Sequence, residues 1–126
     1  MIVKRKQELA GTSRQMGTEK WQTTRLLLRE DGVGLTVTDV TLKAGSDAIY
    51  GYKHHVEIGY CLEGAAEITE LATGIVHKIT PGTLFAATKG ERFRWRSEQP
   101  TRLITIFNPA LVGPEKNDAE GSFELL

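Results

Sequence analysis

The stretch "HHVEIGYC", residues 54–61, places two histidines and a glutamate within four positions. His55 and Glu57 are two residues apart, so in a β-strand both side chains point to one face, within reach of a common ligand. A histidine titrates near neutral pH, and a carboxylate beside it favours general acid–base catalysis. A satisfied buried pair and a metal site are the two other interpretations of this spacing.

Cys61 shares the parity of Glu57 but lies four residues further along, about 13 Å at the usual strand rise. One metal ion cannot bridge that distance, so Cys61 is not expected to complete a site with the pair. His54 has the opposite parity and is expected to face away from them.

Trp21 and Arg25 form a second pair with chemical potential. They are four residues apart and share a face in either a helix or a strand. A guanidinium suits a substrate carboxylate, and an indole ring stacks on a cation. An amphipathic edge that covers the mouth of the fold is the alternative interpretation.

The elements that position these residues are predicted to be short strands. Alternation or apolar runs between Gly and Pro turns predict strands over 35–42, 55–62, 65–71, 75–79, 83–88, 92–97 and 102–107. No long amphipathic helix is indicated. Regularly spaced short strands predict an all-β sandwich or barrel, and the 126 residues fit one domain, 1–126.

Composition excludes several classes of protein. Lys+Arg and Asp+Glu number 16 each, so no net charge favours nucleic acid or an anionic membrane. The stretch "RFRWR" interleaves basic and aromatic residues, but its alternation sends Phe93 and Trp95 inward and the arginines to solvent. Cys61 is the only cysteine, and neither a secretory signal nor an apolar run of membrane-spanning length is present. We therefore expect a cytoplasmic protein without a disulfide.

Several colinear blocks carry a family resemblance: "WQTTRLLLREDGVG", "HHVEIGYCLEG", "LATGIVHKITPGT", "FNPALVGPE" and "GSFELL". Through them the chain resembles the ectoine synthase family of the cupin superfamily over nearly its whole length. The resemblance implies a cupin-type jelly-roll β-barrel and a homodimer. It also implies ring closure of N-γ-acetyl-2,4-diaminobutyrate with loss of water, which gives ectoine, a compatible solute. In the family, Fe(II) is held inside the barrel by a glutamate, a tyrosine and a histidine.

The resemblance also assigns site residues. Glu57 matches the family's glutamate ligand, whereas Phe85 and Phe93 stand at the tyrosine and histidine positions. Phenylalanine offers no lone pair to a metal, so no stoichiometric metal is expected. The residues that match substrate-binding positions are Trp21, Arg25, Tyr52, Phe107 and Glu115.

Two hypotheses follow for the activity. The first is an ectoine synthase-like enzyme that retains Glu57 and His55 as its proton-transfer pair, with a weakened or divergent form of the reaction. The second is a non-catalytic cupin that binds a related small amino-acid derivative. Strand parity and the resemblance together predict that His55, Glu57, Phe85, Phe93 and Phe107 point into one cavity. The "RLITIF" strand is apolar enough to be buried on both faces, and Phe123, Leu125 and Leu126 of the C-terminus are expected to dock either on the body of the domain or on a second subunit. These apolar surfaces predict the homodimer interface.

Overall fold

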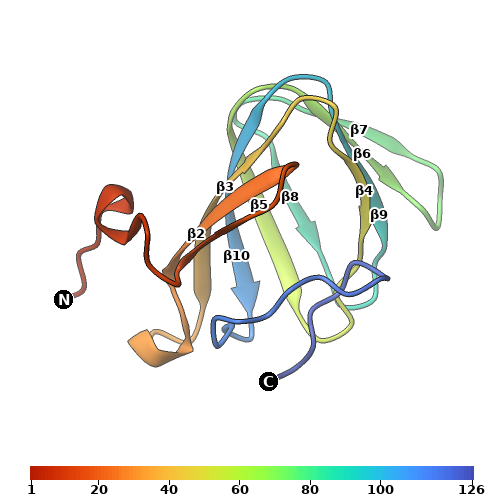
Figure 1. The fold of residues 1–126 in the computed structure, drawn as a ribbon. Helices are drawn as coiled ribbons and strands as arrows, with labels where there is room; N and C mark the ends of the chain where they lie inside the picture. The colour runs from red at the N-terminus through yellow and green to blue at the C-terminus, as the bar shows by residue number, and fades with distance from the viewer.

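The computed structural model describes residues 1–126 and consists almost entirely of β-strands (Figure 1). The only helical elements are the short 3₁₀ turns η1 (Lys6–Leu9) and η2 (Arg29–Asp31). No helix has the length and apolar character required to cross a membrane. The strands are β1 (Gln15–Gly17), β2 (Trp21–Leu27), β3 (Thr36–Leu42), β4 (Asp47–Tyr50), β5 (Val56–Glu63), β6 (Ala66–Glu70), β7 (Val76–Ile79), β8 (Leu84–Ala87), β9 (Phe93–Ser97) and β10 (Thr101–Asn108).

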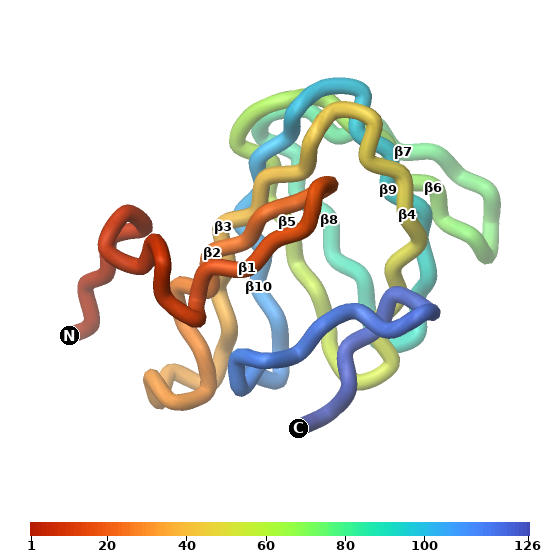
Figure 2. Tube along the Cα trace, viewed as in Figure 1, coloured from red at the N-terminus to blue at the C-terminus, as the bar shows by residue number.

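The strands form two antiparallel sheets that face each other around a common interior (Figure 2). The six-stranded sheet has the order β1-β2-β3-β10-β5-β8, and the four-stranded sheet has the order β4-β9-β6-β7. Neighbours in space are distant in sequence, as in β10, which pairs with both β3 and β5. The prediction of an all-β fold with little helix is confirmed.

Alternation of side chains fixes which face of each strand is inside. In β9, Phe93 and Trp95 are buried while Arg94 and Arg96 are exposed, as the sequence predicts. Both outward arginines lie within ion-pair distance of Asp47 on β4, at 2.6 and 3.7 Å. The "RFRWR" stretch is therefore one wall of the interior with a solvated outer face.

Strand β10 occupies the centre of the larger sheet. Its residues Leu103 and Phe107 are buried on the inner face, whereas Ile104 and Ile106 remain half-buried on the outer face of this single chain. The expectation that this strand is buried on both faces is thus met on the inner face, and the outer face is left open.

Three of the strands, β1, β2 and β4, were not predicted from the sequence, and the β2 segment was left open between helix and strand. β1 lies in a polar segment with weak periodicity, and β4 follows directly on a turn at 44–47. β4 is held in place by its pairing with β9, in which Tyr50 lies opposite Phe93. This long-range partner, rather than local alternation, makes the segment a strand.

The C-terminal segment after β10 contains no regular strand and crosses the end of the barrel (Figures 1 and 2). Its Phe123 is buried in a cluster with Tyr52, Phe107 and Leu111. Gly121, at φ 83°, accepts a hydrogen bond from the backbone N–H of Gly51, and a Cβ there would collide with backbone atoms of β4. The sequence left open whether this tail docks on its own domain, and the structure shows that it does.

A half-buried aspartate anchors the N-terminal arm to the barrel. The Asp31 carboxylate accepts hydrogen bonds from Lys4 Nζ at 2.7 Å, from Arg14 Nη1 at 2.8 Å and from the Leu28 N–H at 2.8 Å. The hydrogen bond from Arg14 is the main cause that holds the pKa of Asp31 well below its usual value. Asp31 therefore binds protons less readily in the folded chain than in the unfolded chain.

We expect Asp31→Asn to lower the free energy of unfolding at pH 7 by about 1–2 kcal/mol, because charge-assisted hydrogen bonds are lost. The contribution of Asp31 is present above its unfolded pKa of about 4 and disappears as the pH falls toward the folded value. Urea unfolding between pH 7 and pH 2 measures both effects. As the pH falls from 7 to 2, the free energy of unfolding of Asp31→Asn should decrease less than that of the unmodified protein. Glu8→Gln, at an exposed residue, should alter neither the free energy of unfolding at pH 7 nor its dependence on pH. Parallel profiles for Asp31→Asn and the unmodified protein would contradict the assignment.

Candidate active site

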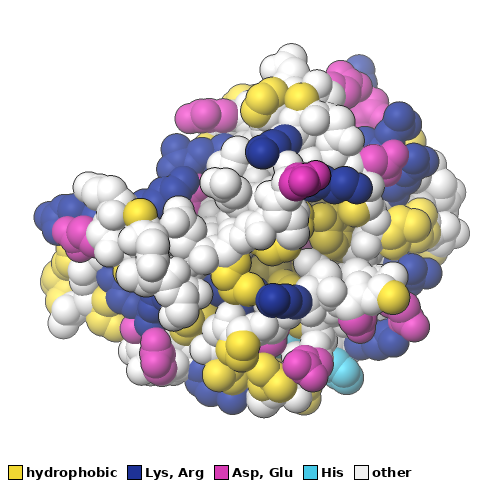
Figure 3. All heavy atoms as spheres, in the orientation of Figure 1, with side chains coloured by type: hydrophobic (Ala, Val, Ile, Leu, Met, Phe, Trp, Pro, Cys, Tyr) yellow, Lys and Arg dark blue, Asp and Glu magenta, His cyan; other side chains and the backbone are white.

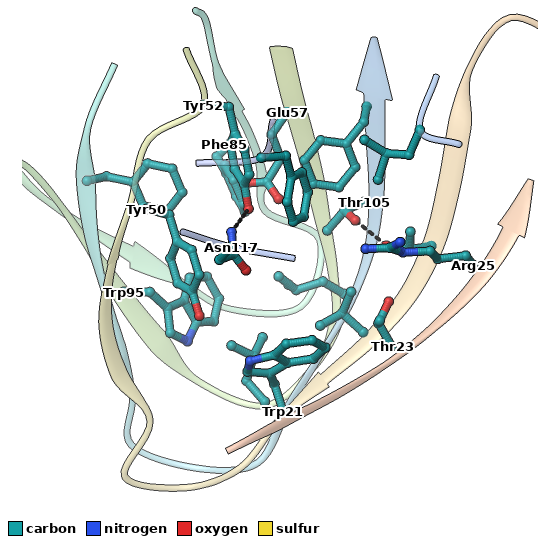
Figure 4. Close-up of a pocket in the computed structure, with 18 residues that line it drawn as sticks. Trp21, Thr23, Arg25, Tyr50, Tyr52, Glu57, Phe85, Trp95, Thr105 and Asn117 are labelled. Atoms are coloured by element: carbon teal, nitrogen blue, oxygen red, sulfur yellow. Dashed lines mark hydrogen bonds between the residues drawn. The ribbon is translucent and has the colours of Figure 1, made fainter. Parts of the chain in front are cut away.

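One cavity of about 80 Å³ lies between the two sheets (Figure 4). A volume of this size holds roughly five waters or one compact small molecule. Both sheets and the C-terminal segment contribute to its wall. The lining residues are Trp21, Thr23, Arg25, Thr38, Val40, Leu42, Tyr50, Tyr52, Glu57, Phe85, Phe93, Trp95, Leu103, Thr105, Phe107, Leu111, Asn117 and Phe123.

Glu57 supplies the only carboxylate in this wall. It lies on β5, where it is opposite Phe107 of β10 on one side and Ala87 of β8 on the other. Burial alone raises its pKa to about 8, and no hydrogen bond from the protein stabilises the charged form. In Figure 4 its carboxyl group points into the cavity. Glu57 is therefore available both to donate and to accept a proton near neutral pH.

The two phenylalanines at the expected ligand positions face the same space as Glu57. Phe85 lies opposite Gly59, and its ring covers that glycine so closely that a Cβ at position 59 would overlap it. The Phe85 and Phe93 ring centroids are 5.9 Å apart. The expected convergence of Glu57, Phe85, Phe93 and Phe107 on one cavity is therefore what the structure shows.

The donor set of this cavity does not fit Fe(II). No group of three His, Cys, Asp or Glu side chains comes together anywhere in the chain. The phenol groups of Tyr50 and Tyr52 add oxygens, but burial, and next the charge of Glu57, raises the pKa of both, so they stay neutral. A single carboxylate among neutral phenols and phenyl rings lacks the imidazole and anionic ligands that hold this ion in proteins.

Arg25 borders the cavity from β2, on the same face as Trp21, as their spacing predicts. It is 2% exposed. Its Nη1 donates to the Gly113 carbonyl, and its Nη2 donates to the Glu115 carbonyl at 2.7 Å. The Nε–H has no acceptor in the protein, although buried donors are rarely left unpaired.

Glu115 does not line the cavity, which corrects its expected contact with substrate. Its carboxylate is 1% exposed and accepts hydrogen bonds from the Val112 and Gly113 N–H groups, each at 2.7 Å. Burial raises the pKa of Glu115, but these backbone hydrogen bonds outweigh burial and keep the pKa below its usual value. One oxygen lies 3.9 Å from Arg25 Nη1, so Glu115 stands behind Arg25 and fixes its position.

His55 is also absent from the cavity wall, contrary to the expectation that it shares the site with Glu57. It precedes β5, which begins at Val56, so strand alternation does not extend to it. The residue is 1% exposed, and its ring meets Phe107 and Phe123 edge-on, at centroid distances of 6.4 and 6.2 Å. Burial lowers its pKa, and its Nδ1 has no partner. His55 thus supports two cavity-lining rings from behind.

Several lining residues received no role from sequence reasoning. Asn117 comes from the C-terminal segment and donates to the Tyr52 hydroxyl at 3.4 Å and to the Gly121 carbonyl at 3.1 Å. Thr38 and Thr105 hydrogen-bond each other across β3 and β10. Their inward parity was readable from the strand alternation, whereas the position of Asn117 depends on the fold of an irregular segment.

The cavity opens to the surface beside Trp21, Tyr50 and Asn117. These residues also line an outer groove that includes Ile49 and Asp118. Figure 3 shows a hollow with apolar atoms at its floor near the middle of this face. A small molecule therefore has a route from solvent to Glu57.

Comparisons with known proteins agree with this geometry. The family model described as ectoine synthase matches residues 1–126. The L-ectoine synthases of Oceanobacillus iheyensis and Desulfosudis oleivorans are 36% and 41% identical to the chain, and each match covers all of it and 98% of the relative. The crystal structure of ectoine synthase from P. lautus superposes with a TM-score of 0.85 at 39% identity and covers 90% of this chain and 81% of that one.

More distant structures share only the fold. The Schizosaccharomyces pombe Cnp3 cupin domain has a TM-score of 0.62 at 16% identity, and it covers 73% of this chain and 66% of that one. The expected cupin-type jelly roll is thus confirmed. On the family model and these relatives together, the chain belongs to the ectoine synthase family.

Proposed function

We propose that the protein closes the ring of N-γ-acetyl-2,4-diaminobutyrate with loss of water to form ectoine. The observation that carries the proposal is the lone Glu57 carboxyl, with a raised pKa, facing an aromatic cavity that Arg25 also borders. Relatives at 36–41% identity over the whole chain are L-ectoine synthases, which supports an enzyme rather than a non-catalytic binding protein.

The reaction requires two protons to move from nitrogen to oxygen. The α-ammonium group must lose a proton before its nitrogen attacks the acetyl carbonyl carbon, and a C–N bond then forms. A second proton leaves the same nitrogen, the carbonyl oxygen departs as water, and the positive charge remains on the cyclic amidine. Burial raises the pKa of Glu57 to about 8, which makes it a stronger base than an ordinary carboxylate, so it can take each proton from nitrogen and return it to oxygen.

Other lining residues hold the chain of the substrate in its folded-back conformation. Arg25 is the partner for the carboxylate, and its unpaired Nε–H is a donor that a ligand acceptor would satisfy. Trp21, Tyr52 and Phe107 enclose the methylene chain. Orientation of amine and carbonyl within one molecule supplies a large part of the acceleration, since effective molarities reach about 10⁵ M or more.

His55 and Glu115 act as positioning residues in this proposal. His55 packs behind Phe107 and Phe123, and Glu115 orients Arg25 through the 112–115 loop. Neither is assigned a contact with the reacting atoms. The proton transfers are thus assigned to Glu57 alone.

The proposed reaction proceeds without a stoichiometric metal. Fe(II) would serve as a Lewis acid on the carbonyl oxygen, and the Phe85 and Phe93 rings leave Glu57 without partner ligands for it. The rate should therefore be far below that of a relative with a complete ligand set.

We further propose a homodimer built on the outer face of the six-stranded sheet. Cross-strand pairing aligns Leu84, Tyr60 and Ile104 in one row and Ala86, Ile58 and Ile106 in the next. Leu84 is 61% exposed and Tyr60 is 44% exposed in the single chain, so this face is an apolar surface that a second copy would cover. Phe123 packs within its own chain, so Leu125 and Leu126 are the hydrophobic residues of the tail that remain exposed for an interface. We also place the protein in the cytoplasm, a reducing compartment, because the thiol of Cys61 is buried and forms no disulfide.

Ile104→Arg is expected to convert this dimer to a monomer, because it places a charge at the centre of the apolar face. Light scattering at micromolar concentration should give the mass of two chains for the unmodified protein and of one chain for the variant. Val33→Arg, at an exposed turn residue, is the control and should remain dimeric. A single-chain mass for the unmodified protein would contradict the proposed interface.

The activity itself is tested by incubating the purified protein with N-γ-acetyl-2,4-diaminobutyrate and following product by chromatography and mass spectrometry. Loss of one water per substrate and co-elution with ectoine are expected. Recovery of unchanged substrate after prolonged incubation with concentrated protein would refute ring closure.

A further inference from the structure

The interior cavity meets a second, larger groove at two phenylalanine rings. This seam groove has a volume of about 600 Å³ and is lined chiefly by residues of β6, β7 and β8 and by residues 91–93. Strands β7 and β8 are the ends of the two sheets, and each is paired on one side only. Phe85 and Phe93 line both the cavity and the seam groove. The two rings therefore form a partition between these spaces.

The ring of Phe85 is held in this partition by its neighbours. It lies on Gly59 of β5, where a Cβ would overlap it. Its centroid is 5.9 Å from that of Phe93 and 6.3 Å from that of Trp95. Phe85 is half-buried, whereas Phe93 is 5% exposed. Because Phe85 stands on the end strand and is the less buried of the two, it is the ring whose removal would join the cavity to the seam groove.

The floor of the seam groove is apolar. Ile68 is 5% exposed and Ile79 is 1% exposed, and both line the groove. The polar side chains of Glu70 and His77 belong to its exposed rim, where they hydrogen-bond each other at 2.5 Å. An alkyl chain that passed the position of Phe85 would therefore bury its surface against apolar side chains.

The order of the strands determines which end of the substrate reaches the partition. Arg25 on β2 and Phe85 on β8 lie to opposite sides of Glu57 on β5 (Figure 4). In the proposed reaction the substrate carboxylate lies toward Arg25, and the amine and the acyl carbonyl lie at Glu57. One nitrogen separates the carbon that bears the carboxylate from the acyl carbon in the ring that forms, so the two substituents project apart. The alkyl end of the acyl group is thus directed toward Phe85.

We propose that Phe85, supported by Phe93, determines the length of the acyl group that the protein accepts, and that the seam groove is an acyl-chain site which the Phe85 ring keeps closed. This inference rests on the proposed function, which places the carboxylate at Arg25 and the acyl carbonyl at Glu57. A longer acyl group leaves the reaction unchanged: the amine nitrogen bonds to the acyl carbon, and the acyl oxygen departs as water. Only the alkyl substituent on the cyclic amidine differs.

The test compares the N-γ-acetyl, N-γ-propionyl and N-γ-butyryl derivatives of 2,4-diaminobutyrate as substrates. For the unmodified protein, kcat/KM should fall at least about tenfold with each added methylene, because a closed apolar pocket rejects one methylene by about 10–200-fold. Phe85→Ala should bring the three values within about tenfold of one another. Phe85→Leu, a milder change, should shift the ratios in the same direction. A folded Phe85 variant with the ratios of the unmodified protein would overturn the inference.

Phe123→Leu is the matched control. Phe123 also lines the cavity, but its ring packs against Tyr52 and Phe107 and does not border the seam groove. This variant should keep the acyl ratios of the unmodified protein, whatever its overall rate, and thermal melts show which variants are folded. If Phe123→Leu relaxed the ratios as much as Phe85→Ala, general loosening of the cavity rather than the partition would set acyl length, and the inference would fail.

The same series separates this inference from the proposed function. If the acetyl compound is converted and the acyl ratios do not respond to Phe85, the inference fails and the proposed function stands. If no compound is converted, the proposed function fails, and calorimetric affinities for the three compounds decide the inference. A preference of the unmodified protein for the acetyl compound that Phe85→Ala removes would uphold it, whereas equal affinities, or no binding, would overturn it.

Discussion

Glu57→Gln is expected to lower the rate of ring closure by about 10²–10⁴-fold, the range typical of a lost general acid–base catalyst. Glutamine matches the shape of glutamate but neither accepts the amine proton nor returns one to the departing oxygen. Glu57 is the only carboxylate of the cavity wall, so no neighbouring acid replaces it. The initial rate of ectoine formation at saturating substrate measures the loss.

The matched control is Glu63→Gln, on the same strand but exposed to solvent. It should retain the full rate. The pH profile gives a second check, since activity that depends on Glu57 should change around pH 8, where burial places its pKa. Comparable rates for Glu57→Gln and Glu63→Gln would show that Glu57 is not the proton-transfer group.

The double change Phe85→Tyr with Phe93→His is expected to produce a protein that binds about one iron per chain and closes the ring about 10²–10³-fold faster. The two new side chains add a phenol oxygen and an imidazole nitrogen to the Glu57 carboxylate. A Lewis acid on the carbonyl oxygen then stabilises charge that develops in the transition state, an effect of this size. Both replacements are close in volume to phenylalanine, so the packing of Phe85 on Gly59 should be preserved.

Elemental analysis and the ring-closure assay on the same samples test this expectation. Each single replacement should bind iron weakly, and adding Glu57→Ala to the double variant should remove the metal. A double variant that takes up iron and gains no activity would show that the phenylalanines are not what limits the rate.

The strands that carry the site could be predicted because one face of each is buried. In "RFRWRS" the alternation of residues identifies the inward side chains Phe93 and Trp95 correctly. In "RLITIF" apolar residues stand on both faces, so the inward position of Phe107 was supplied by the family resemblance. The short strands β1 and β4 were missed because pairing with other strands, rather than local pattern, determines them. Strand β2 was left open between helix and strand, because residues four apart share a face in both. The family resemblance supplied the jelly roll, which periodicity alone left as a sandwich or a barrel.

The site was predicted well on strands and poorly beyond them. Trp21, Arg25 and Glu57 lie where strand parity and the resemblance placed them. His55 was placed wrongly because the strand begins one residue later, at Val56. Glu115 lies in the irregular C-terminal segment. The path of this segment across the barrel depends on individual contacts, such as the hydrogen bond from the Gly113 N–H to the Glu115 carboxylate, and sequence periodicity does not predict such contacts.

The central claim is that this chain forms ectoine with Glu57 and without a bound metal. The most direct measurement is the initial rate of ectoine formation by protein treated with a chelator, beside the same protein supplied with Fe²⁺, with the metal content of both samples determined. We predict slow but measurable formation of ectoine in both samples, at the same rate, with far less than one iron per chain. An inactive chelated sample whose activity returns in proportion to iron, up to one per chain, would contradict the claim.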